Sequence, residues 1–573
     1  MGNKVMRPAQ PGRTFPAGPA SFMGRARRYE QRSVANHRGQ RQHRVRIWSP
    51  IVFKGFDPIM NLRCPALALL LVVPVISRAQ QLRTVQARIG DGVVEGVVSA
   101  DNQVRTFKGI PFAAPPIGAL RWAPPQPVIP WIGVLKTVDY GPRPMQERVF
   151  DDMIFHDKGP SEDCLYLNLW LPENHGPEKL PVMVWIFGGG FVAGSTSEPR
   201  QDAGNLCKKG VLIVSANYRL GVFGLLAHPA LTKESGMRAS GNYAILDQIA
   251  ALKWVKRNIA AFGGNPGNVT IFGESAGSAS VSALVASPLA KGLFERAICE
   301  SGTVFNPSSK MATLAEGEAQ GVALATQLGK TTIDELRSLP AAEIMASLKA
   351  HPLHFSLVVD GHVFPQDPTA TYMSGAQNRV PLLVGWNRDE GRNAFFGKEK
   401  PTLARYAELV HAKLGDKADA ILKEYPATTD AEAVGASTDL GVDMSNSYTT
   451  WKWLGAQAAT GSPVYRYRFD QFLPAPVNGA PHACEIEYVF RVLSSRNLPW
   501  TDADRQTSEV ISTYWTNFAK TGNPSGAGLP EWPTCSAEAG YPIMHLEPIP
   551  HPETDSHLRH YILMDSISTA SRN

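Results

Sequence analysis

Hydrophobic residues in the middle of the chain fall into short unbroken runs that alternate with segments of helical periodicity. Leu180–Gly189 (LPVMVWIFGG) and Gly210–Arg219 (GVLIVSANYR) are short apolar runs without polar alternation, as is typical of strands buried on both faces. Residues 244–264 repeat apolar residues at helical spacing and stop at two glycines, and the run Asn268–Gly273 follows. Strand, helix and strand in this order predict an α/β fold with a mostly parallel central sheet and helices on both faces.

The second half of the chain is richer in helical patterns. Residues 313–329 and 403–425 have amphipathic spacing, and the periodic segment 507–524 ends at a glycine and a proline. No low-complexity linker or internal repeat divides residues 80–573. A length prior of roughly 150 residues per domain favours about three domains, but the candidate catalytic residues span most of this stretch. We therefore predict one catalytic domain over residues 80–573.

Charge is distributed unevenly along the chain. The overall net charge is +6, yet residues 1–59 alone carry +10 from ten Arg and two Lys against Glu30 and Asp57. Arg63 and Arg78 add two further positive charges, which leaves −6 for residues 80–573. The predicted domain is therefore acidic, and a nucleic-acid-binding class is not expected.

Residues 60–79 have the layout of a secretory signal peptide. A Met and an Arg precede an apolar run from Pro65 to Ile76, and the small residues Ser77 and Ala79 follow. The run has 12 residues, fewer than the roughly 20 needed to cross a bilayer. We expect cleavage after Ala79, a secreted or periplasmic protein, and no stable membrane span. Residues 1–59 are interpreted as a disordered leader or a wrongly extended start.

The segment NVTIFGESAGSAS, residues 268–280, places Ser275 between two glycines. An apolar run leads into Gly-Glu-Ser-Ala-Gly and a helix of small residues follows, which is the strand, sharp turn and helix of a nucleophile elbow. The alternative is that the serine only caps the helix that it begins. The surrounding pattern favours a catalytic nucleophile.

A serine nucleophile needs donors for the oxyanion that it creates. Three glycines, Gly188 to Gly190, directly follow the predicted strand PVMVWIF, and their backbone could approach a carbonyl oxygen closely. The alternative of a phosphate-binding loop lacks the spacing of either common phosphate motif. We expect the backbone N–H groups of Gly189, Gly190 and Ala276 to form the oxyanion hole.

The acid and the base should follow the serine in that order. The apolar run Val380–Asn387 leads into Arg-Asp-Glu-Gly, which places Asp389 and Glu390 at the end of a predicted strand. Either carboxylate could orient a catalytic imidazole, and a solvated turn is the alternative.

His482 is the strongest candidate for the base because it lies on a Gly-Ala-Pro loop rather than inside a helical pattern. Residue pattern alone gives it about even weight against the other histidines. The others beyond Glu390 are His411, within a helical pattern, and His545, His551, His557 and His560, in a polar C-terminal stretch.

These motifs resemble the type B carboxylesterases of the α/β-hydrolase fold, a family that includes para-nitrobenzyl esterases and cholinesterases. The resemblance extends from about Gly92 to the C-terminus. It rests on FKGIPFAAPPIGALRWAPPQP, SEDCLYLNLW, WIFGGGF, NYRLGVFGLL, the long segment from GNYAILDQ to GESAGS, RDEG and NFAKTGNP.

The resemblance implies specific roles. The nucleophile, acid and base would be Ser275, Glu390 and His482, and the oxyanion donors would be Gly189, Gly190 and Ala276. Glu274, Ser301 and Glu485 match family positions that support the triad from behind. The implied activity is hydrolysis of small carboxylic esters through an acyl-enzyme, without metal or organic cofactor. Specialisation for aromatic or lipid esters is an alternative, as is a non-catalytic binding protein of the same fold.

Two departures from the family pattern affect this expectation. Pro144 stands where relatives have the cysteine that pairs with the equivalent of Cys164, so the family's first disulfide is not expected. Ile154 stands where cholinesterases carry a choline-binding tryptophan, so the cation–π contribution to binding a quaternary ammonium is missing. Five cysteines remain after the expected cleavage, which removes Cys64: Cys164, Cys207, Cys299, Cys484 and Cys535. The sequence does not specify a pairing among them, the oligomeric state or the preferred ester.

Overall fold

The computed structural model describes residues 83–570 apart from positions 393, 398, 400 and 401. The expected leader and signal peptide, residues 1–79, lie outside the described residues. By contacts between Cα atoms, Arg78–Asn573 group into one compact unit. The fold below is that of the described part of this unit.

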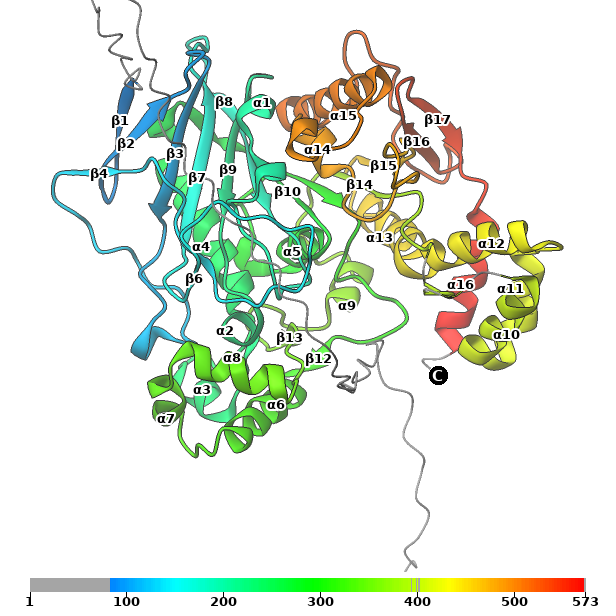
Figure 1. The fold of residues 1–573 in the computed structure, drawn as a ribbon, viewed down its shortest axis with the longest axis horizontal. Coiled ribbons are helices and arrows are strands. Elements are labelled where there is room, and N and C mark those ends of the chain that lie inside the picture. The colour runs from blue at the N-terminus through cyan, green and yellow to red at the C-terminus, as the bar shows by residue number, and fades with distance from the viewer. Residues whose placement is uncertain (1–82, 393, 398, 400–401, 571–573) are drawn as a thin grey trace, which may run out of the picture. The chain divides into compact units, whose positions relative to one another are not determined.

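A thirteen-stranded sheet forms the centre of the described residues (Figure 1). Its strands are, in chain order, β1 (Thr84–Ile89), β2 (Gly92–Val98), β3 (Val104–Pro111), β4 (Val134–Lys136), β7 (Tyr166–Pro172), β8 (Leu180–Ile186), β9 (Leu212–Ala216), β10 (Gly264–Glu274), β11 (Arg296–Glu300), β14 (Leu382–Asn387), β15 (Val464–Phe469), β16 (Pro542–Leu546) and β17 (His551–Thr554). The spatial order is β1-β2-β3-β7-β9-β8-β10-β11-β14-β15-β16-β17, with β4 beside β2. Two small sheets pair β5 (Arg143–Pro144) with β6 (Pro160–Ser161) and β12 (Ala312–Thr313) with β13 (Val358–Val359).

The central strands are parallel from β9 through β16, and the pairs at both edges are antiparallel. The strands β9 and β14 are buried at every residue, as expected for parallel strands covered by helices on both faces. The predicted α/β class is confirmed. Because β10, β11 and β14 are neighbours and parallel, the segments after Glu274, Glu300 and Asn387 emerge side by side at the carboxyl ends of these strands.

Sixteen α-helices accompany the sheet in the described residues. They are α1 (Gly204–Cys207), α2 (Gly221–Leu225), α3 (Pro229–Glu234), α4 (Tyr243–Asn258), α5 (Ala276–Ala286), α6 (Leu314–Gln327), α7 (Ile333–Ser338), α8 (Ala341–Ala350), α9 (Pro368–Met373), α10 (Leu403–Leu414), α11 (Ala418–Glu424), α12 (Asp430–Val442), α13 (Tyr448–Ala458), α14 (Ile486–Val489), α15 (Asp502–Thr521) and α16 (Leu558–Ala570). The helical pattern at 403–425 is two helices, because Gly415 has φ of 54° and the chain turns there.

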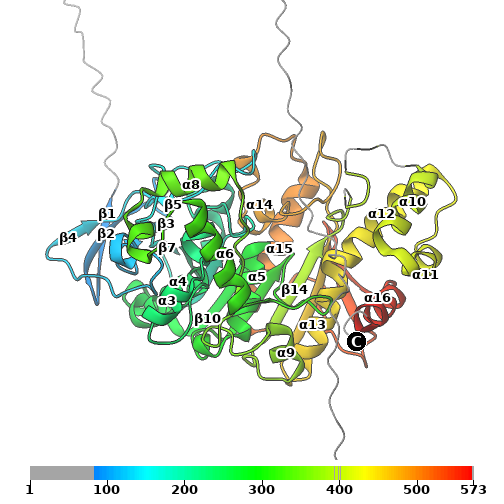
Figure 2. The ribbon, with the colours of Figure 1, turned by 90° about the horizontal axis from the view of Figure 1, so that it is seen from below.

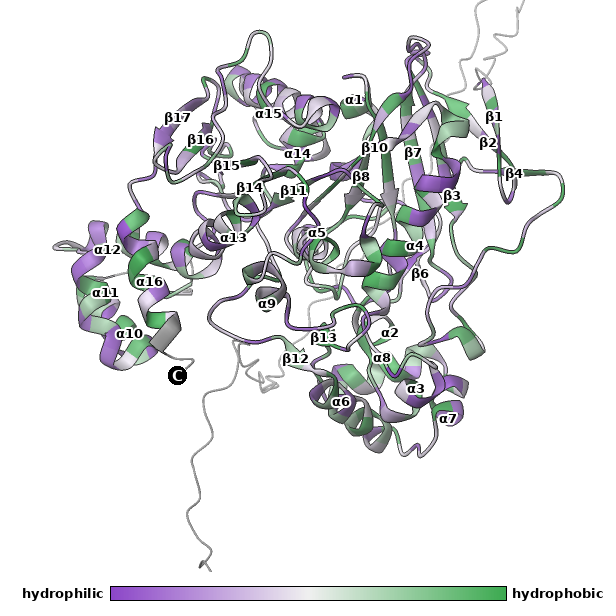
Figure 3. Cartoon of the chain, turned by 180° about the vertical axis from the view of Figure 1, so that it is seen from behind, coloured by the Kyte–Doolittle hydropathy of each residue, from purple (hydrophilic) through white to green (hydrophobic). Residues whose placement is uncertain are grey.

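The helices α10, α11, α12 and α16 lie together beside the end of the sheet that carries β16 and β17 (Figures 1 and 2). They share a hydrophobic cluster of their own, which includes Phe396, Tyr406, Leu440 and Tyr561. Figure 3 shows hydrophobic and hydrophilic residues mixed along these helices, as expected where one face of each is buried. Within the described residues, no helix is long and apolar enough to span a membrane.

Candidate active site

Ser275 occupies the turn between β10 and α5, where the backbone is strained. Its φ of 57° and ψ of −121° place a non-glycine residue outside the regions that side chains prefer. A Cβ atom added at Gly277 would lie 2.0 Å from the carbonyl oxygen of Ile186, and one added at Gly273 would lie 2.6 Å from the same oxygen. The two glycines of the motif are therefore required by the close approach of β8 and α5.

The Ser275 side chain does not cap the helix. No side-chain hydrogen bond is made at the N-terminus of α5, although Ser275 holds the capping position. Its Oγ instead lies 2.8 Å from Nε2 of His482. The hydroxyl thus faces a base, which is the arrangement that activates a serine.

His482 contacts two carboxylates as well as the serine. Its Nδ1 lies 3.4 Å from Oε1 of Glu390, and its Nε2 lies 3.2 Å from Oε1 of Glu274. The Glu390 carboxylate accepts a hydrogen bond from the backbone N–H of Asn387 at 3.1 Å and another from the side-chain amide of Asn446. These donors fix the carboxylate that faces Nδ1.

Asp389, the other acid left open by the sequence, points elsewhere. Its carboxylate accepts a hydrogen bond from the backbone N–H of Ala480 at 2.8 Å, and its own backbone N–H donates to the carbonyl of Ala480 at 2.9 Å. Asp389 therefore anchors the loop that carries His482, and Glu390 is the residue that faces the imidazole. The other candidate histidines have no contact with Ser275 or Glu390 in the described residues; His411 is on α10, and His545, His551, His557 and His560 are on β16, β17 and the start of α16.

The glycine loop after β8 lies directly against the nucleophile. A Cβ atom added at Gly188 would lie 3.0 Å from Cβ of Ser275, and Gly189 and Gly190 have φ of 104° and 64°. Among the described residues, no protein acceptor takes the backbone N–H of Gly189, Gly190 or Ala276. These three N–H groups are therefore available as hydrogen-bond donors beside Ser275, at the carboxyl ends of the central strands.

Two side chains hold this loop in place from outside. Gln146 donates to the carbonyl of Gly194 at 2.8 Å and accepts from the N–H of Gly194 at 2.9 Å. Tyr218 donates its hydroxyl to the carbonyl of Phe187 at 2.7 Å. Both ends of the glycine loop are therefore fixed by side-chain hydrogen bonds, as a preorganised oxyanion site requires.

Three buried glutamates lie behind the triad. Burial raises the pKa of Glu274 to about 7 and that of Glu485 to about 8, and burial together with the neighbouring Glu485 raises the pKa of Glu300 well above its usual value. The Glu485 carboxylate accepts a hydrogen bond from the side-chain amide of Asn387, and the Glu300 carboxylate accepts one from the indole N–H of Trp515 at 2.8 Å. Packing several carboxyl groups in a buried region favours the neutral form of some of them.

Ser301 shares this layer but does not reach the imidazole. Its φ is 56°, and its backbone N–H donates to the carbonyl of Gly385 at 2.9 Å. The hydroxyl is buried and makes no hydrogen bond in the structure. The neighbouring carbonyl of Glu300 accepts from the N–H of Ser275 at 2.8 Å, so this segment supports the elbow through its backbone.

The electrostatics of His482 follow from its position. Burial of the ring lowers the pKa of His482, but the carboxylates of Glu274 and Glu390 outweigh burial and raise it above its usual value. The side chain remains 46% exposed, so solvent moderates this effect. The two carboxylates favour the imidazolium that forms when the ring accepts the serine proton.

The structure adds residues that the sequence pattern did not single out. Asn387 connects Glu390, Glu485 and the carbonyl of Pro481, so it joins the end of β14 to the histidine loop. Its place directly before RDEG was a usable signal. Asn446 lies 56 residues beyond Glu390, and no local pattern connects the two.

Five cysteines lie in the described residues, and all are free and buried: Cys164, Cys207, Cys299, Cys484 and Cys535. Pro144 lies in β5, which pairs with β6 close to Cys164. An ion pair of 2.6 Å between Arg143 and Asp157 holds the same segment. Backbone pairing and an ion pair therefore join two stretches of this segment, and Cys164 forms no disulfide within the described residues.

Groups suited to hold a metal ion occur outside this site. Two clusters have donor atoms close enough together, within the described residues: Asp443 with His557 and His560, and His545 with His551 and Glu553. No residue of the Ser275 site belongs to either cluster.

Comparison with known proteins identifies relatives over most of the chain. Residues 81–560 match the Carboxylesterase family. The chain is 37% identical to fumonisin B1 esterase of Sphingopyxis macrogoltabida over 80% of this chain and 86% of that protein. It is 37% identical to para-nitrobenzyl esterase of Bacillus subtilis (strain 168) over 78% and 92% of the two chains. A solved structure of a PNB esterase superposes with a TM-score of 0.72 at 34% identity, covering 83% of this chain and 99% of that one.

The fold and the site therefore define a serine hydrolase of the α/β-hydrolase class. The chain belongs to the carboxylesterase family and is a type B carboxylesterase similar to para-nitrobenzyl esterases.

Proposed function

We propose that Ser275, His482 and Glu390 carry out ester hydrolysis through an acyl-enzyme. This proposal rests on the 2.8 Å distance between Ser275 Oγ and His482 Nε2. The Ser275 hydroxyl makes no capping hydrogen bond to α5, so it is available to the base. Glu390, 3.4 Å from Nδ1, would hold the ring in the required tautomer and stabilise its charged form.

The reaction proceeds in two halves. His482 takes the Ser275 proton as Oγ attacks the ester carbonyl, and the proton then passes to the departing alcohol. A water molecule, deprotonated by the same imidazole, attacks the acyl-enzyme and releases the acid. The N–H groups of Gly189, Gly190 and Ala276 would bind the oxyanion at each stage, which is supported by their freedom from protein acceptors.

Covalent labelling tests this proposal. A fluorophosphonate should label Ser275 alone, as located by peptide mass spectrometry, and Ser275→Ala should lose both labelling and turnover of para-nitrophenyl butyrate. Ser374→Ala is a matched control, because that hydroxyl only caps α9 through the carbonyl of Thr371. Labelling elsewhere, or wild-type turnover by a folded Ser275→Ala variant, would contradict the assignment. A non-catalytic binding protein would remain unlabelled.

We propose neutral esters, rather than choline esters, as the substrate class. Ile154 is 59% exposed, and the adjacent Met153 reaches the glycine loop, since its Cε lies 3.1 Å from a Cβ atom added at Gly189. An isoleucine at this position offers no aromatic face to a quaternary ammonium. A thiocholine ester should therefore show a lower kcat/KM than a neutral thioester with the same acyl group. A preference for the thiocholine ester would refute this proposal. A series of acyl chain lengths, with an aromatic ester added, would define the acyl preference.

We also propose that the protein is exported. The support is the apolar segment within residues 60–79, which lies outside the described residues. Expression from Met60 in a bacterial host should give a secreted or periplasmic esterase whose first residue is Gln80. Cytoplasmic protein that retains residues 60–79 would contradict this.

A further inference from the structure

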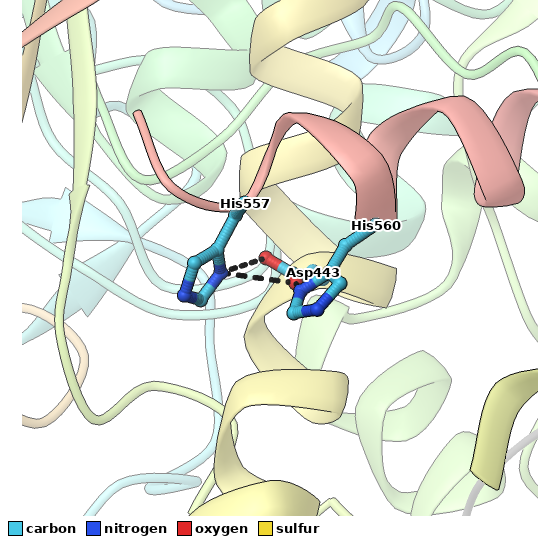
Figure 4. Close-up of side chains that lie close together, drawn as sticks. All are labelled: Asp443, His557 and His560. Carbon is cyan, nitrogen blue, oxygen red and sulfur yellow. Dashed lines mark hydrogen bonds and ion pairs between the residues drawn. The ribbon is translucent and has the colours of Figure 1, made fainter. Parts of the chain in front are cut away.

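Asp443, His557 and His560 bring three potential metal ligands to one point, away from Ser275. Nδ1 of His560 lies 3.0 Å from Oδ2 of Asp443, and Nδ1 of His557 lies 3.2 Å from the same oxygen. Figure 4 shows both imidazole rings turned toward the carboxylate, one from each side. Asp443 is more than 110 positions away in the sequence from the segment that carries both histidines.

The backbone positions these residues well. Asp443 begins a π-helical turn, Asp443–Ser447, inserted between α12 and α13, and such turns are frequent at functional sites. His557 lies in the turn directly before α16, and His560 lies in the first turn of that helix, three positions further on. Asp443 is only 1% exposed, so its carboxylate requires charged or hydrogen-bonding partners.

The hydrogen bonds of His560 leave one ring nitrogen to be explained. Nε2 lies 3.1 Å from the carbonyl oxygen of Glu424, which can only accept, so Nε2 carries a proton. In a neutral ring, Nδ1 then presents a lone pair to the Asp443 carboxylate. Two electron-rich groups at 3.0 Å repel unless a positive charge lies between them, either as a second proton on the ring or as a metal ion. Metal-binding histidines typically direct their other N–H to a backbone carbonyl in this manner.

The distances from the Asp443 carboxylate to the two imidazoles suit a small tetrahedral ion. Zinc lies about 2.0–2.2 Å from histidine nitrogen and carboxylate oxygen, which places neighbouring ligand atoms roughly 3.3 Å apart. The distances from Oδ2 of Asp443 to the two imidazoles, 3.0 and 3.2 Å, are close to that value. The outer carboxylate contacts are also present, since Tyr425 donates to Oδ2 at 2.8 Å and Ser447 donates to Oδ1.

A polar cavity of about 220 Å³ opens onto Asp443 and His557. Four carboxylates and two guanidinium groups line it: Asp439, Asp443, Glu553 and Asp555, with Arg388 and Arg468. Arg468 is itself paired with Asp470 at 2.7 Å. Asp555 is in turn paired with Arg466 at 2.5 Å, which leaves Asp439, Asp443 and Glu553 against Arg388. This excess of negative charge favours a cation over an anion, and the volume leaves room for water to complete its coordination.

We propose that Asp443, His557 and His560 bind a divalent transition metal ion, with zinc as the best match, and that water from the cavity completes the coordination. The ion joins the first turn of α16 to the π-helical turn that also carries Asn446. The site is separate from the chemistry of Ser275 and departs from the expectation that the protein holds no metal. Two imidazoles and one carboxylate are the donors that zinc prefers among divalent ions.

Two other arrangements make different predictions. In the first, His560 is a protonated imidazolium paired with Asp443, and no metal binds. In the second, the cation binds instead at His545, His551 and Glu553, where Nδ1 of His545 bonds to Asp470 at 2.6 Å and Nε2 lies 3.5 Å from Glu553. Titration with Zn²⁺ separates these three arrangements.

The full chain, stripped with EDTA, is titrated with Zn²⁺ by calorimetry. We expect one equivalent to bind at this site, and His557→Ala and His560→Ala each to weaken that binding by about 100-fold or more, beyond the roughly 10–100-fold that loss of an outer partner costs. His551→Ala should retain this equivalent. His411→Ala, an exposed histidine on α10, is the control for surface binding.

Unchanged Zn²⁺ binding in the His557→Ala/His560→Ala double variant would overturn the proposal, as would failure of the wild-type chain to bind. Loss of the equivalent in His551→Ala would also overturn it. If the variants do not fold, X-ray absorption of the zinc-loaded His551→Ala protein gives the same decision. Scattering from two imidazoles supports the site, and its absence rejects it.

Discussion

The Ser275 site and the Asp443 site both combine imidazole with buried carboxylate, yet they differ in what the remaining ring nitrogen meets. At His482, Nδ1 faces Glu390 and Nε2 lies 2.8 Å from a serine hydroxyl, which can give up a proton. At His560, Nδ1 faces Asp443 and Nε2 lies 3.1 Å from a backbone carbonyl, which cannot. The first arrangement can transfer a proton, whereas the second fits the metal ion that we propose there.

Exposure follows the same division. The His482 side chain is 46% exposed, on a loop that a substrate can reach. The His560 side chain is 17% exposed and packs against Tyr425, with the two rings tilted by 34° and 4.1 Å between their centroids. Residue types alone therefore do not distinguish a catalytic histidine from a ligand. The atoms around the second nitrogen do.

The largest expected difference between the two regions is in the effect of removing each histidine. His482→Ala should lower kcat by about 10⁵-fold or more, because the hydroxyl loses its base and the residues of a triad act as a unit. His560→Ala should leave the turnover of the folded enzyme within about tenfold. Single-turnover kinetics with para-nitrophenyl butyrate measures both. Comparable losses in the two variants would mean that the regions do not have separate roles.

A smaller loss is expected from Glu390→Gln. Oε1 of Glu390 faces Nδ1 of His482 and the N–H of Asn387, and Oε2 faces the amide of Asn446. A glutamine must place its NH₂ group against one of these donors, so the imidazole loses its orientation. We expect kcat to fall by about 10³–10⁴-fold, as when the acid of other triads becomes an amide.

Asp389→Asn is the control for Glu390→Gln. Its carboxylate contacts Ala480 on the histidine loop, so we expect an effect on stability and a much smaller one on kcat. A larger loss of kcat in Asp389→Asn would reverse the assignment of the acid.

The sequence predicted the elements that carry the chemistry because their signals are local. The apolar runs that became β8, β10 and β14, the glycines on both sides of Ser275 and the glycine loop are each contained within about ten residues. A Cβ atom added at Gly277 would lie 2.0 Å from a backbone oxygen of another segment, so only glycine fits there. The motif therefore directly reflects a steric constraint.

The choice of the acid and the surroundings of the C-terminal histidines could not be predicted from the sequence, because both depend on contacts between distant segments. Residue pattern left Asp389 and Glu390 equivalent, and only the resemblance to a family favoured Glu390. The structure separates them because one carboxylate turns to Ala480 and the other to His482. The C-terminal histidines form one polar stretch in the sequence, yet His545 is a strand residue only 7% exposed and His560 lies in the first turn of a helix.

A more modest effect is expected from Glu274→Gln on the pH dependence of the first site. Glu274 and Glu390 raise the pKa of His482, and the base must be neutral to accept the serine proton. Activity should therefore rise with pH up to values above the usual histidine pKa. Removing the charge of Glu274, which lies 3.2 Å from Nε2, should move this rise about one pH unit lower.

The profile of kcat/KM against pH, measured for wild type and Glu274→Gln, checks this shift. Glu485→Gln is the matched comparison, because its carboxylate bonds to Asn387 and raises the pKa of His482 less than Glu274 does, so its removal should give a smaller shift in the same direction. A rise that moves to higher pH in Glu274→Gln would show that Glu274 does not act on His482 as a negative charge.

The smallest effect is expected where the two regions meet, at Asn446. Its amide binds Glu390 on the catalytic side, and three residues earlier the same π-helical turn begins with Asp443. Asn446→Ala removes one of the donors that hold the Glu390 carboxylate while the N–H of Asn387 remains, so kcat should fall by about threefold to tenfold, equal to roughly 1 kcal/mol for one hydrogen bond. If α16 is tied to this turn by a metal ion, EDTA treatment should lower kcat of the wild type by a similar small factor and have little further effect on Asn446→Ala. Additive losses from EDTA and Asn446→Ala would mean that the Asp443 site does not act on the triad through this residue.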